Sequence, residues 1–220
     1  MSDDVLQRVA VMARMQNEHN LRVHPEWRDQ GHEYFRAIWV ECAELLDHFG
    51  WKWWKYQQPD LEQVRLEIVD IWHFGLSELL RAGKIDDSHC DTDVLETFVV
   101  GLDGTAGDFR ECVERLALSS LTGRSFDLEA FVAVLVAMPM SFEELFTGYI
   151  GKNVLNNFRQ NHGYQSGEYV KVWQGREDNE HLMELIAGLD QQHVDFVDQL
   201  YAALEARYQT SAGSAPNTSR

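Results

Sequence analysis

Apolar side chains recur three or four residues apart along almost the whole chain, and this spacing leaves few folds open. Such a stripe is typical of an amphipathic α-helix, and the two-residue alternation of a half-buried strand is absent. Only four prolines interrupt the pattern. The spacing predicts helices over residues 4–20, 32–49, 60–81, 92–100, 104–121, 127–138, 141–162 and 179–207. We therefore expect an all-α fold, a helical bundle.

Length and local composition predict how this bundle is organised. A chain of 220 residues can form one domain, which we expect over residues 1–208. The acidic, less periodic segment 82–103 is expected to join two helical halves. Residues 209–220 are small and polar and include a proline, so we expect a disordered tail.

The formal net charge of −17 limits the partners that the protein can have. Nucleic acid and anionic membranes would repel such a chain, and we expect neither as a partner. The three cysteines, Cys42, Cys90 and Cys112, show no CxxC spacing, which is typical of reduced thiols in a cytosolic protein. Because no signal peptide or transmembrane run is evident, we expect a soluble cytoplasmic protein.

Two carboxylate pairs flank the turn at residues 50–59. Glu41 and Glu44 are three residues apart, as are Glu67 and Asp70, so each pair shares a helix face. At about 1.5 Å rise per residue, both pairs lie roughly 10 Å from the turn and would meet in an antiparallel hairpin. Four converging carboxylates need cations, and oxygen ligands suit Mg²⁺ or Mn²⁺ better than Zn²⁺.

Two other interpretations of these acids remain open on the residues alone. They could be exposed charges on amphipathic helices, although apolar neighbours such as Cys42 and Ile68 argue against this. A di-iron bundle would need two Glu-x-x-His motifs. The chain offers only Asp70 with His73, so we do not favour a di-iron site.

Polar residues near both ends of the chain are spaced so that they share helix faces. Lys152, Asn156 and Arg159 share one face of a predicted helix in the one locally basic stretch, which could hold a triphosphate or simply be solvated. Gln16 and Asn20 lie one helical turn apart; paired amides can donate and accept hydrogen bonds together, or they can simply be surface residues.

Several motifs resemble those of a known family. "ECAELLDHFGWKWWK" followed by "EIVDIWHFGLS" is similar to the dimeric dUTPases, of the all-α nucleoside triphosphate pyrophosphatase superfamily that includes the MazG-like and dCTP pyrophosphatases. "MQNEHN" and "YIGKNVLNNFRQNHGYQSGEYVKVWQGREDN" resemble further signatures of these enzymes. The resemblance implies a four-helix metal-binding core, with residues 82–140 as a variable lobe.

The resemblance also implies an activity. We expect Mg²⁺-dependent hydrolysis of dUTP, and of dUDP, to dUMP by a metal-activated water, with Mn²⁺ as a possible substitute. Glu41, Glu44, Glu67 and Asp70 would hold the metal, and Glu44 is favoured over Glu41 as the residue that accepts the proton of the water. The enzyme would be a homodimer in a bacterial cytosol or a virus-infected cell.

Substrate contacts follow from the same resemblance. The residues that it assigns to substrate are Gln16 and Asn20 for the base, Phe74 for the deoxyribose, Lys55 or Lys52, Lys152, Asn156, Arg159 and Lys171 for the phosphates, and Tyr164 for closing the site. At least one of Trp51, Trp53 and Trp54 is expected to anchor the core, and His73 is expected to be structural.

Two rival functions remain open. A relative that prefers dCTP or a broader set of dNTPs would share the acids, because amides recognise cytosine too. A catalytically silent helical scaffold is the other rival, but it would not need all four acids and the basic face.

Overall fold

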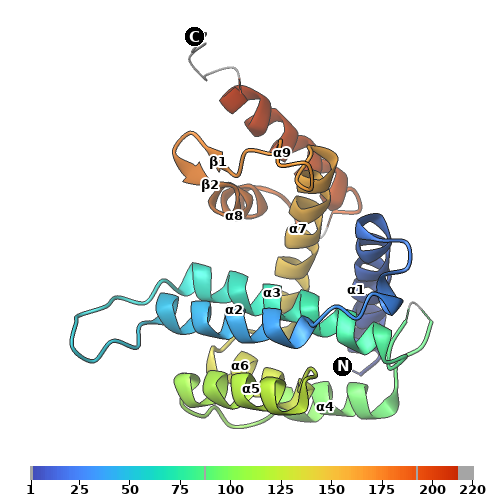
Figure 1. Cartoon of the computed structure of the whole chain (residues 1–220), viewed down its shortest axis with the longest axis vertical. Coiled ribbons are helices and arrows are strands. Elements are labelled where there is room, and N and C mark those ends of the chain that lie inside the picture. The colour runs from blue at the N-terminus through green and yellow to red at the C-terminus, as the bar shows by residue number, and fades with distance from the viewer. Residues whose placement is uncertain (1, 87, 192, 213–220) are drawn as a thin grey trace. The chain divides into compact units, whose positions relative to one another are not determined.

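The computed structural model describes residues 2–86, 88–191 and 193–212, and most of them are helical (Figure 1). The elements are α1 (Ser2–Val23), η1 (Trp27–Asp29), α2 (Tyr34–Phe49), α3 (Leu61–Arg81), α4 (Thr92–Leu102), α5 (Phe109–Gly123), α6 (Leu128–Ala137), α7 (Phe142–Asn161), β1 (Val172–Trp173), β2 (Arg176–Glu177), α8 (Asp178–Gly188) and α9 (Phe196–Ala212). The predicted all-α class is confirmed.

Aspartates fix where several helices begin. The side chain of Asp60 accepts a hydrogen bond from the backbone N–H of Gln63, which caps the start of α3. Asp108 caps α5 in the same way, through the N–H of Glu111. The predicted start of this helix at residue 104 is therefore wrong, because the chain first becomes helical behind this cap.

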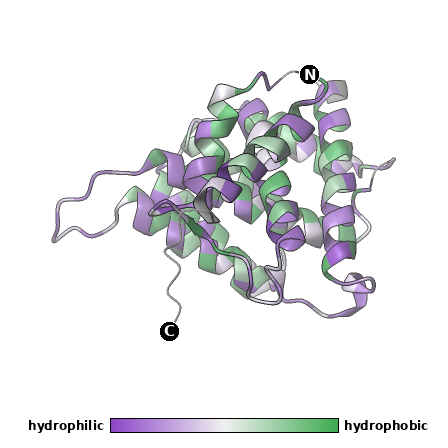
Figure 2. Ribbon diagram, turned by 90° about the horizontal axis from the view of Figure 1, so that it is seen from above, coloured by the Kyte–Doolittle hydropathy of each residue, from purple (hydrophilic) through white to green (hydrophobic). Residues whose placement is uncertain are grey.

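The described residues divide into two compact units, one up to Tyr149 and one from Ile150. In the first unit, α2 packs along α3 as a hairpin, α5 packs on α2, and α6 packs on both α5 and α4 (Figure 1). Helix α1 covers α3 and α4. Figure 2 shows hydrophobic and hydrophilic residues sharing each of these helices, as an amphipathic bundle requires.

Aromatic rings fill the core of the first unit. Trp72, on α3, is fully buried, and its ring stacks on Phe131 with centroids 5.3 Å apart. The edge of Phe98 meets the same ring at 5.2 Å. The indole Nε1–H of Trp72 donates to the sulfur of Met12, on α1. The apolar stripes that predicted the helices therefore meet in one core.

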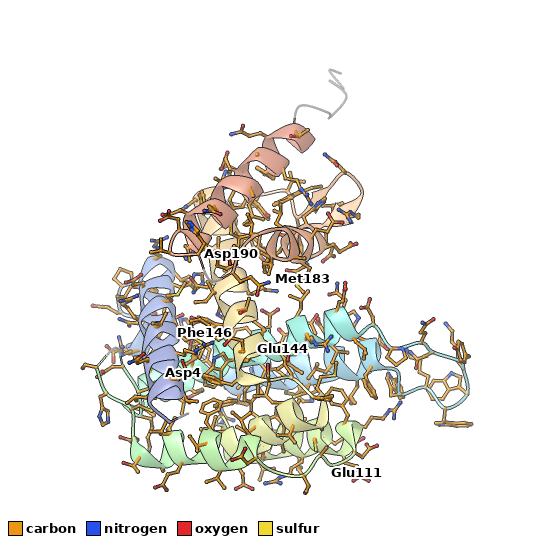
Figure 3. All side chains as sticks on the ribbon, turned by 180° about the vertical axis from the view of Figure 1, so that it is seen from behind. Asp4, Glu111, Glu144, Phe146, Met183 and Asp190 are labelled. Carbon is orange, nitrogen blue, oxygen red and sulfur yellow. The ribbon has the colours of Figure 1, made fainter. Side chains whose placement is uncertain are left out.

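The start of α7 is held to α1 within the first unit. The hydroxyl of Tyr149 lies 3.0 Å from the carbonyl oxygen of Met12. Arg8 donates to Asp4 at 3.0 Å and forms an ion pair with Glu143, and its guanidinium lies 4.9 Å from the centre of the Phe146 ring. Figure 3 labels Asp4 on α1 and Phe146 on α7, the two helices that Arg8 joins.

In the second unit, the rest of α7 packs with a two-stranded hairpin, α8 and α9. Phe158 is fully buried and contacts the rings of Trp173, Tyr201 and Tyr208, with centroids 5.4–5.8 Å apart. The strands β1 and β2 are antiparallel and pair Trp173 with Arg176. Each strand has only two residues, too few for an alternating pattern to be visible in the sequence.

The predicted single helix over residues 179–207 is wrong. Helix α8 ends at Gly188, where Leu189 is extended with φ −110° and ψ 154°. Helix α9 begins at Phe196. Just before it, the backbone N–H of Asp195 donates to the ring Nδ1 of His193, and the N–H of Phe196 donates to the carbonyl of His193.

Three further expectations concern the organisation of the chain. Helix α9 continues through Ala212, into the predicted tail, with the Thr210 hydroxyl donating to the Ala206 carbonyl. Residues 213–220 lie outside the described residues, and one domain over residues 1–208 stays a prediction. Within the described ranges, no single helix is long and apolar enough to span a membrane, although α6 and α7 taken as one bent pair would be. Cys42, Cys90 and Cys112 are free thiols.

Candidate active site

The α2–α3 hairpin positions the predicted carboxylates, and its turn is fixed by a few contacts. Gly50 ends α2 with φ +89°, a conformation that L side chains rarely adopt. The side-chain oxygen of Gln57 accepts hydrogen bonds from the N–H groups of Trp51 and Lys52, at 3.0 and 2.7 Å. The N–H of Asp60 donates to the carbonyl of His48 at 2.9 Å, which closes the turn.

Three carboxylates from the two helices of this hairpin come together. Glu41 of α2 and Glu67 and Asp70 of α3 each offer an oxygen within 4.8 Å of the others. Glu67 is only 7% exposed, and the other two side chains are half-buried. The equal distances of the pairs from the turn in sequence predicted this meeting.

The protonation of Glu41 reflects its surroundings. Burial and the negative charges of Asp70 and Glu67 raise the pKa of Glu41 to about 9, and a hydrogen bond with Glu67 and the charge of Glu44 act in the same direction. Glu41 is therefore protonated at neutral pH in the metal-free chain. A bound cation would counter both causes, the burial of the charged form and the negative charge of the neighbours, so this group is well suited to binding a cation.

The fourth predicted ligand, Glu44, lies outside this group of three. Its side chain is exposed on α2, one helical turn nearer the hairpin turn than Glu41. Its charge still contributes to the raised pKa of Glu41, so it lies on the same side of the hairpin. His48, a further turn along, places its Nε2 3.7 Å from an oxygen of Glu67.

The donor set fits a divalent cation with a preference for oxygen. Three carboxylate oxygens within 4.8 Å of one another can reach a common ion, and the half-exposed position leaves room for further oxygen ligands. No cysteine belongs to this group, which is consistent with Mg²⁺ or Mn²⁺ rather than Zn²⁺.

The tryptophans of the turn do not anchor the core, contrary to the prediction. Trp51, Trp53 and Trp54 are 47%, 90% and 57% exposed. The turn extends beyond the helices (Figure 1), and the rings of Trp51 and Trp53 each meet the ring of Trp54 edge to face at 5.2–5.4 Å, while the indole N–H of Trp51 donates to Asp47. Lys52 is bound by Asp47 at 2.5 Å, and Lys55 is exposed.

The predicted base-binding residues lie in a buried polar network. The Nε2 of Gln16 donates to Asn20 Oδ1 at 3.0 Å and to Ser77 Oγ at 3.2 Å, and the Nδ2 of Asn20 donates to Ser77 Oγ at 3.0 Å. His73 Nδ1 lies 2.7 Å from Gln16 Oε1, and the Tyr149 hydroxyl lies 3.0 Å from the same oxygen. The ring of His73 is buried in this network, and its structural role stays a prediction.

Phe74 lies one helical turn beyond Asp70 on α3. Its side chain is half-buried and contacts the ring of Tyr34, with centroids 6.4 Å apart. This ring contact neither requires nor excludes the predicted contact with deoxyribose.

Apart from Lys55 and Lys52 in the hairpin turn, the predicted phosphate-binding residues belong to the second unit, where carboxylates and amides hold them. Arg159 donates through Nε and NH2 to both oxygens of Asp178, at 2.8 Å each, and through NH1 to Asn156 at 3.1 Å. Lys152 is 3% exposed, and its Nζ donates to Asn179 Oδ1 at 3.1 Å.

Asp178 organises this group of residues. It is fully buried, and burial would raise its pKa, but the Arg159 guanidinium and the Tyr169 hydroxyl lower the pKa below its ordinary value. The exposed Lys171 forms an ion pair with Glu177 at 2.9 Å. Tyr164 is 50% exposed, and the Arg159 guanidinium lies 5.9 Å from the centre of its ring.

A cavity of about 290 Å³ lies elsewhere in the first unit, near the carboxyl end of α3. Its lining includes Glu78, Lys84, Asp93, Thr97 and Phe126, and none of the predicted site residues. We place the active site by its clustered carboxylates rather than by this cavity.

Sequence reasoning missed six residues that the structure ties to the predicted site residues: His48, Ser77, Tyr149, Tyr169, Asp178 and Asn179. Two of these had a readable signal. His48 lies four residues after Glu44, and Ser77 lies four after His73, so each shares a helix face with a residue already singled out. Tyr149, Tyr169, Asp178 and Asn179 lie inside the quoted segment that resembles a family signature, but no argument singled them out.

Residues 8–164, most of the chain, match the sequence model of a family described as dUTPase. With its all-α fold, the chain belongs to this family of nucleotide hydrolases. It is a dUTP diphosphatase, an enzyme whose substrate is a nucleotide. No curated protein gives a match to the chain.

Proposed function

We propose that this dUTP diphosphatase depends on Mg²⁺ held by Glu41, Glu67 and Asp70. The observation that carries the proposal is the approach of three carboxylates within 4.8 Å, with the pKa of Glu41 raised to about 9 by burial and neighbouring negative charge. When bound, Mg²⁺ neutralises charge on the phosphate oxygens and lowers the pKa of water.

The side chains of the hairpin have distinct parts in this proposal. Glu67 and Asp70 are the ligands contributed by α3, and Glu41 becomes a ligand when it releases its proton. Glu44 is exposed and stands outside the group of three, so we assign to its carboxylate the role of orienting the attacking water and accepting its proton.

The substrate contacts belong to the same proposal. We assign the base to Gln16 and Asn20, the deoxyribose to Phe74, and the phosphates to Lys55, Lys152, Asn156, Arg159 and Lys171, with Tyr164 closing over the bound nucleotide. The bidentate pairing with Asp178 supports a role for Arg159, because it holds the guanidinium in one orientation.

Hydrolysis of dUDP, a homodimeric assembly and a cytoplasmic location also stay proposals, as does a relation to the MazG-like enzymes. No observation on the structure favours dCTP or a broader set of dNTPs over dUTP, so we keep dUTP as the substrate.

The test is pyrophosphate release from dUTP, dCTP, dTTP and UTP by the full chain, with Mg²⁺, with Mn²⁺ and with EDTA. We expect turnover of dUTP that EDTA abolishes and that Glu67→Gln lowers at least about a hundredfold, as for other groups that stabilise transition-state charge. Glu62→Gln is the matched control, because Glu62 is exposed on the same helix.

Three outcomes would contradict parts of the proposal. Full activity in EDTA would exclude the metal dependence. Equal losses in Glu67→Gln and Glu62→Gln would remove the carboxylate group from the mechanism. Preferential turnover of dCTP would leave the metal site in place and overturn the assignment of the base.

A further inference from the structure

The cavity at the carboxyl end of α3 is built by segments that are separate in the sequence. The end of α3, the start of α4, the segment between α5 and α6 and the start of α6 all border it. Its volume of about 290 Å³ exceeds the roughly 150 Å³ of an apolar cavity that holds benzene, so one ring with a short chain has room in it. Its apolar lining residues are Leu79, Ala82, Val94, Phe126 and Leu128, and its polar ones are Glu78, Lys84, Asp93, Thr97 and Ser125.

Apolar side chains form most of the buried part of this lining. Leu79 and Val94 are 9% and 3% exposed. The ring of Phe126 rests on the backbone of α3 at Gly75, where an added Cβ would lie 2.6 Å from a ring atom. The centroid of the same ring lies 6.1 Å from that of Trp72, in the core. The wall is therefore apolar and held in place, and it suits a ligand with an apolar body.

Glu78 is the buried acid of the lining, with 8% of its surface exposed. Both of its carboxylate oxygens accept from one nitrogen, NH2 of Arg81, at 2.8 and 2.6 Å. A carboxylate has about four lone-pair sites, so this single partner leaves each oxygen able to accept again. Burial raises the pKa of Glu78, although the Arg81 guanidinium acts to lower it. A second positive partner would therefore stabilise the charged form of Glu78.

Thr97 offers a further acceptor. Its hydroxyl donates to the backbone carbonyl of Asp93 at 2.7 Å, so the single hydroxyl proton is already used. The oxygen keeps its lone pairs, and a ligand that meets it must bring an N–H or O–H group. Thr97 is half-buried, whereas Asp93 and Ser125 are exposed, so the lining reaches from the core to solvent.

The positive charge of the lining is already compensated. Among the described lining residues only Lys84 is basic, and its Nζ lies 3.0 Å from Asp91 Oδ2 and 3.1 Å from Asp93 Oδ2. An anionic ligand would have to compete with both carboxylates and would meet Glu78 in the same lining. The cavity therefore favours a ligand that donates hydrogen bonds and carries a positive charge.

We propose that this cavity binds a small organic amine, whose ammonium group donates to Glu78 and Thr97. The apolar body of the amine packs on Leu79, Val94 and Phe126. An ammonium group has three N–H donors and no acceptor, which matches the acceptors of Glu78 and Thr97, and charge-assisted hydrogen bonds are stronger than neutral ones. The site uses none of the residues assigned to the metal or to the nucleotide, so the inference does not rest on the proposed function.

The first experiment compares three probes that share a ring and differ in charge: 2-phenylethylamine, 2-phenylethanol and phenylacetate. Each is titrated into the ¹⁵N-labelled full chain at neutral pH, and the amide chemical shifts report both the affinity and the place of binding. We expect the amine to bind at least about tenfold more tightly than the alcohol, because its hydrogen bond to a carboxylate is charge-assisted, and phenylacetate to bind most weakly. The shifts should centre on residues 78–84, 93–97 and 125–128.

Three results of this titration would overturn the proposal. One is equal affinity for the amine and the alcohol, which would remove the role of charge. Another is no binding of the amine at millimolar concentration. The third is a set of amine-induced shifts that spread over other acidic surfaces without reaching the three segments, which would reduce the binding to the general attraction of an acidic chain for cations.

The second experiment repeats the titration in variants. Glu78→Gln removes the charge but keeps an oxygen that can accept from Arg81, so the affinity for the amine should fall to that for the alcohol. Glu96→Gln serves as the control, because Glu96 is exposed on α4 and outside the lining, and it should change neither affinity. Equal losses in the two variants would contradict the proposal. Should Glu78→Gln not fold, Thr97→Val decides: it keeps the shape of the side chain, and an unchanged affinity for the amine would exclude the site.

Discussion

Two carboxyl groups, one fully buried and one half-buried, show how single residues acquire opposite properties in this chain. Asp178 faces the guanidinium of Arg159 and the hydroxyl of Tyr169, so its pKa is lowered despite complete burial. Glu41 faces Glu67 and Asp70, and its pKa is raised to about 9. The charges of the neighbouring groups, rather than burial alone, decide whether the pKa of each carboxyl is raised or lowered. We expect Asp178 to act in stability and Glu41 in cation binding.

Stability of the metal-free chain should fall as the pH rises. Because the pKa of Glu41 is about 9 in the folded chain and near 4.5 when unfolded, the folded state binds the extra proton between these values. The contribution of this proton to the free energy of unfolding is complete below about pH 4.5 and is lost as the pH approaches 9. Thermal unfolding in EDTA from pH 6 to 9 should show a falling Tm, and Glu41→Gln should flatten the dependence.

Mg²⁺ binding should release a proton for the same reason. At pH 7.5 a ligand carboxyl that begins protonated must lose its proton, so we expect close to one proton released per chain. Calorimetric titration of Mg²⁺ in buffers of different ionisation enthalpy measures this number. Proton release that persists in Glu41→Gln would assign the proton to another group.

Replacement of Asp178 should be far more damaging than replacement of a surface acid. Asp178→Asn leaves the Arg159 guanidinium without its buried counter-charge and should cost about 3 kcal/mol of unfolding free energy. Glu129→Gln breaks an exposed pair with Arg115 and should cost less than about 1 kcal/mol. Urea unfolding of both variants measures the difference. Similar costs would mean that the buried pair is not needed for stability.

Among the elements, the α2–α3 hairpin determines where the acids lie. Its antiparallel packing follows from two amphipathic helices and a capped start at Asp60. Its turn is held by Gln57 and by Arg110, whose guanidinium donates to the carbonyl of Gly50 at 2.9 and 2.5 Å. The helices and the turn together set the distance between Glu41 and Glu67.

Gly50 is the position at which this turn is most vulnerable. A Cβ there would lie 3.0 Å from the Cβ of Gln57, in a backbone with φ +89°. Gly50→Ala should lower the unfolding free energy by about 2 kcal/mol. Gly83→Ala, with φ +69° and no atom within 4 Å, should cost about 1 kcal/mol. Denaturant unfolding measures both, and equal losses would show that the contact with Gln57 is unimportant.

Sequence periodicity predicted the elements up to α7 and failed beyond it. Apolar residues continue in helical register through Leu182, Ile186, Val197 and Leu200, so a helix of 29 residues looked continuous across the break at Leu189. The hairpin of β1 and β2 is too short to show alternation. Both features depend on tertiary contacts, such as those around Phe158, that no local pattern reports.

At the scale of the whole molecule, spacing predicted the site only in part. The motif distances brought Glu41, Glu67 and Asp70 together because helical rise and a shared turn determine them. They could not show that Glu44 is exposed, nor that carboxylates beyond the basic stretch fold back onto Arg159 and Lys171. The net charge of a stretch does not show which acidic residues outside it pair with its basic side chains.

A homodimer stays a prediction for the whole molecule. Light scattering during size exclusion should give a mass of twice 25.4 kDa at micromolar concentration. A mass of 25.4 kDa across the concentration range would contradict the dimer without affecting the activity.

The exposed turn allows ligand binding to be followed by tryptophan fluorescence. Of seven tryptophans, Trp51, Trp53 and Trp54 of the turn and Trp39 of α2 are exposed, whereas Trp27, Trp72 and Trp173 are buried. Emission should therefore separate into a red-shifted part that acrylamide quenches and a blue part that it does not. Any ligand that orders or covers the turn should change the first part alone, so nucleotide arrival can be followed by fluorescence without a label.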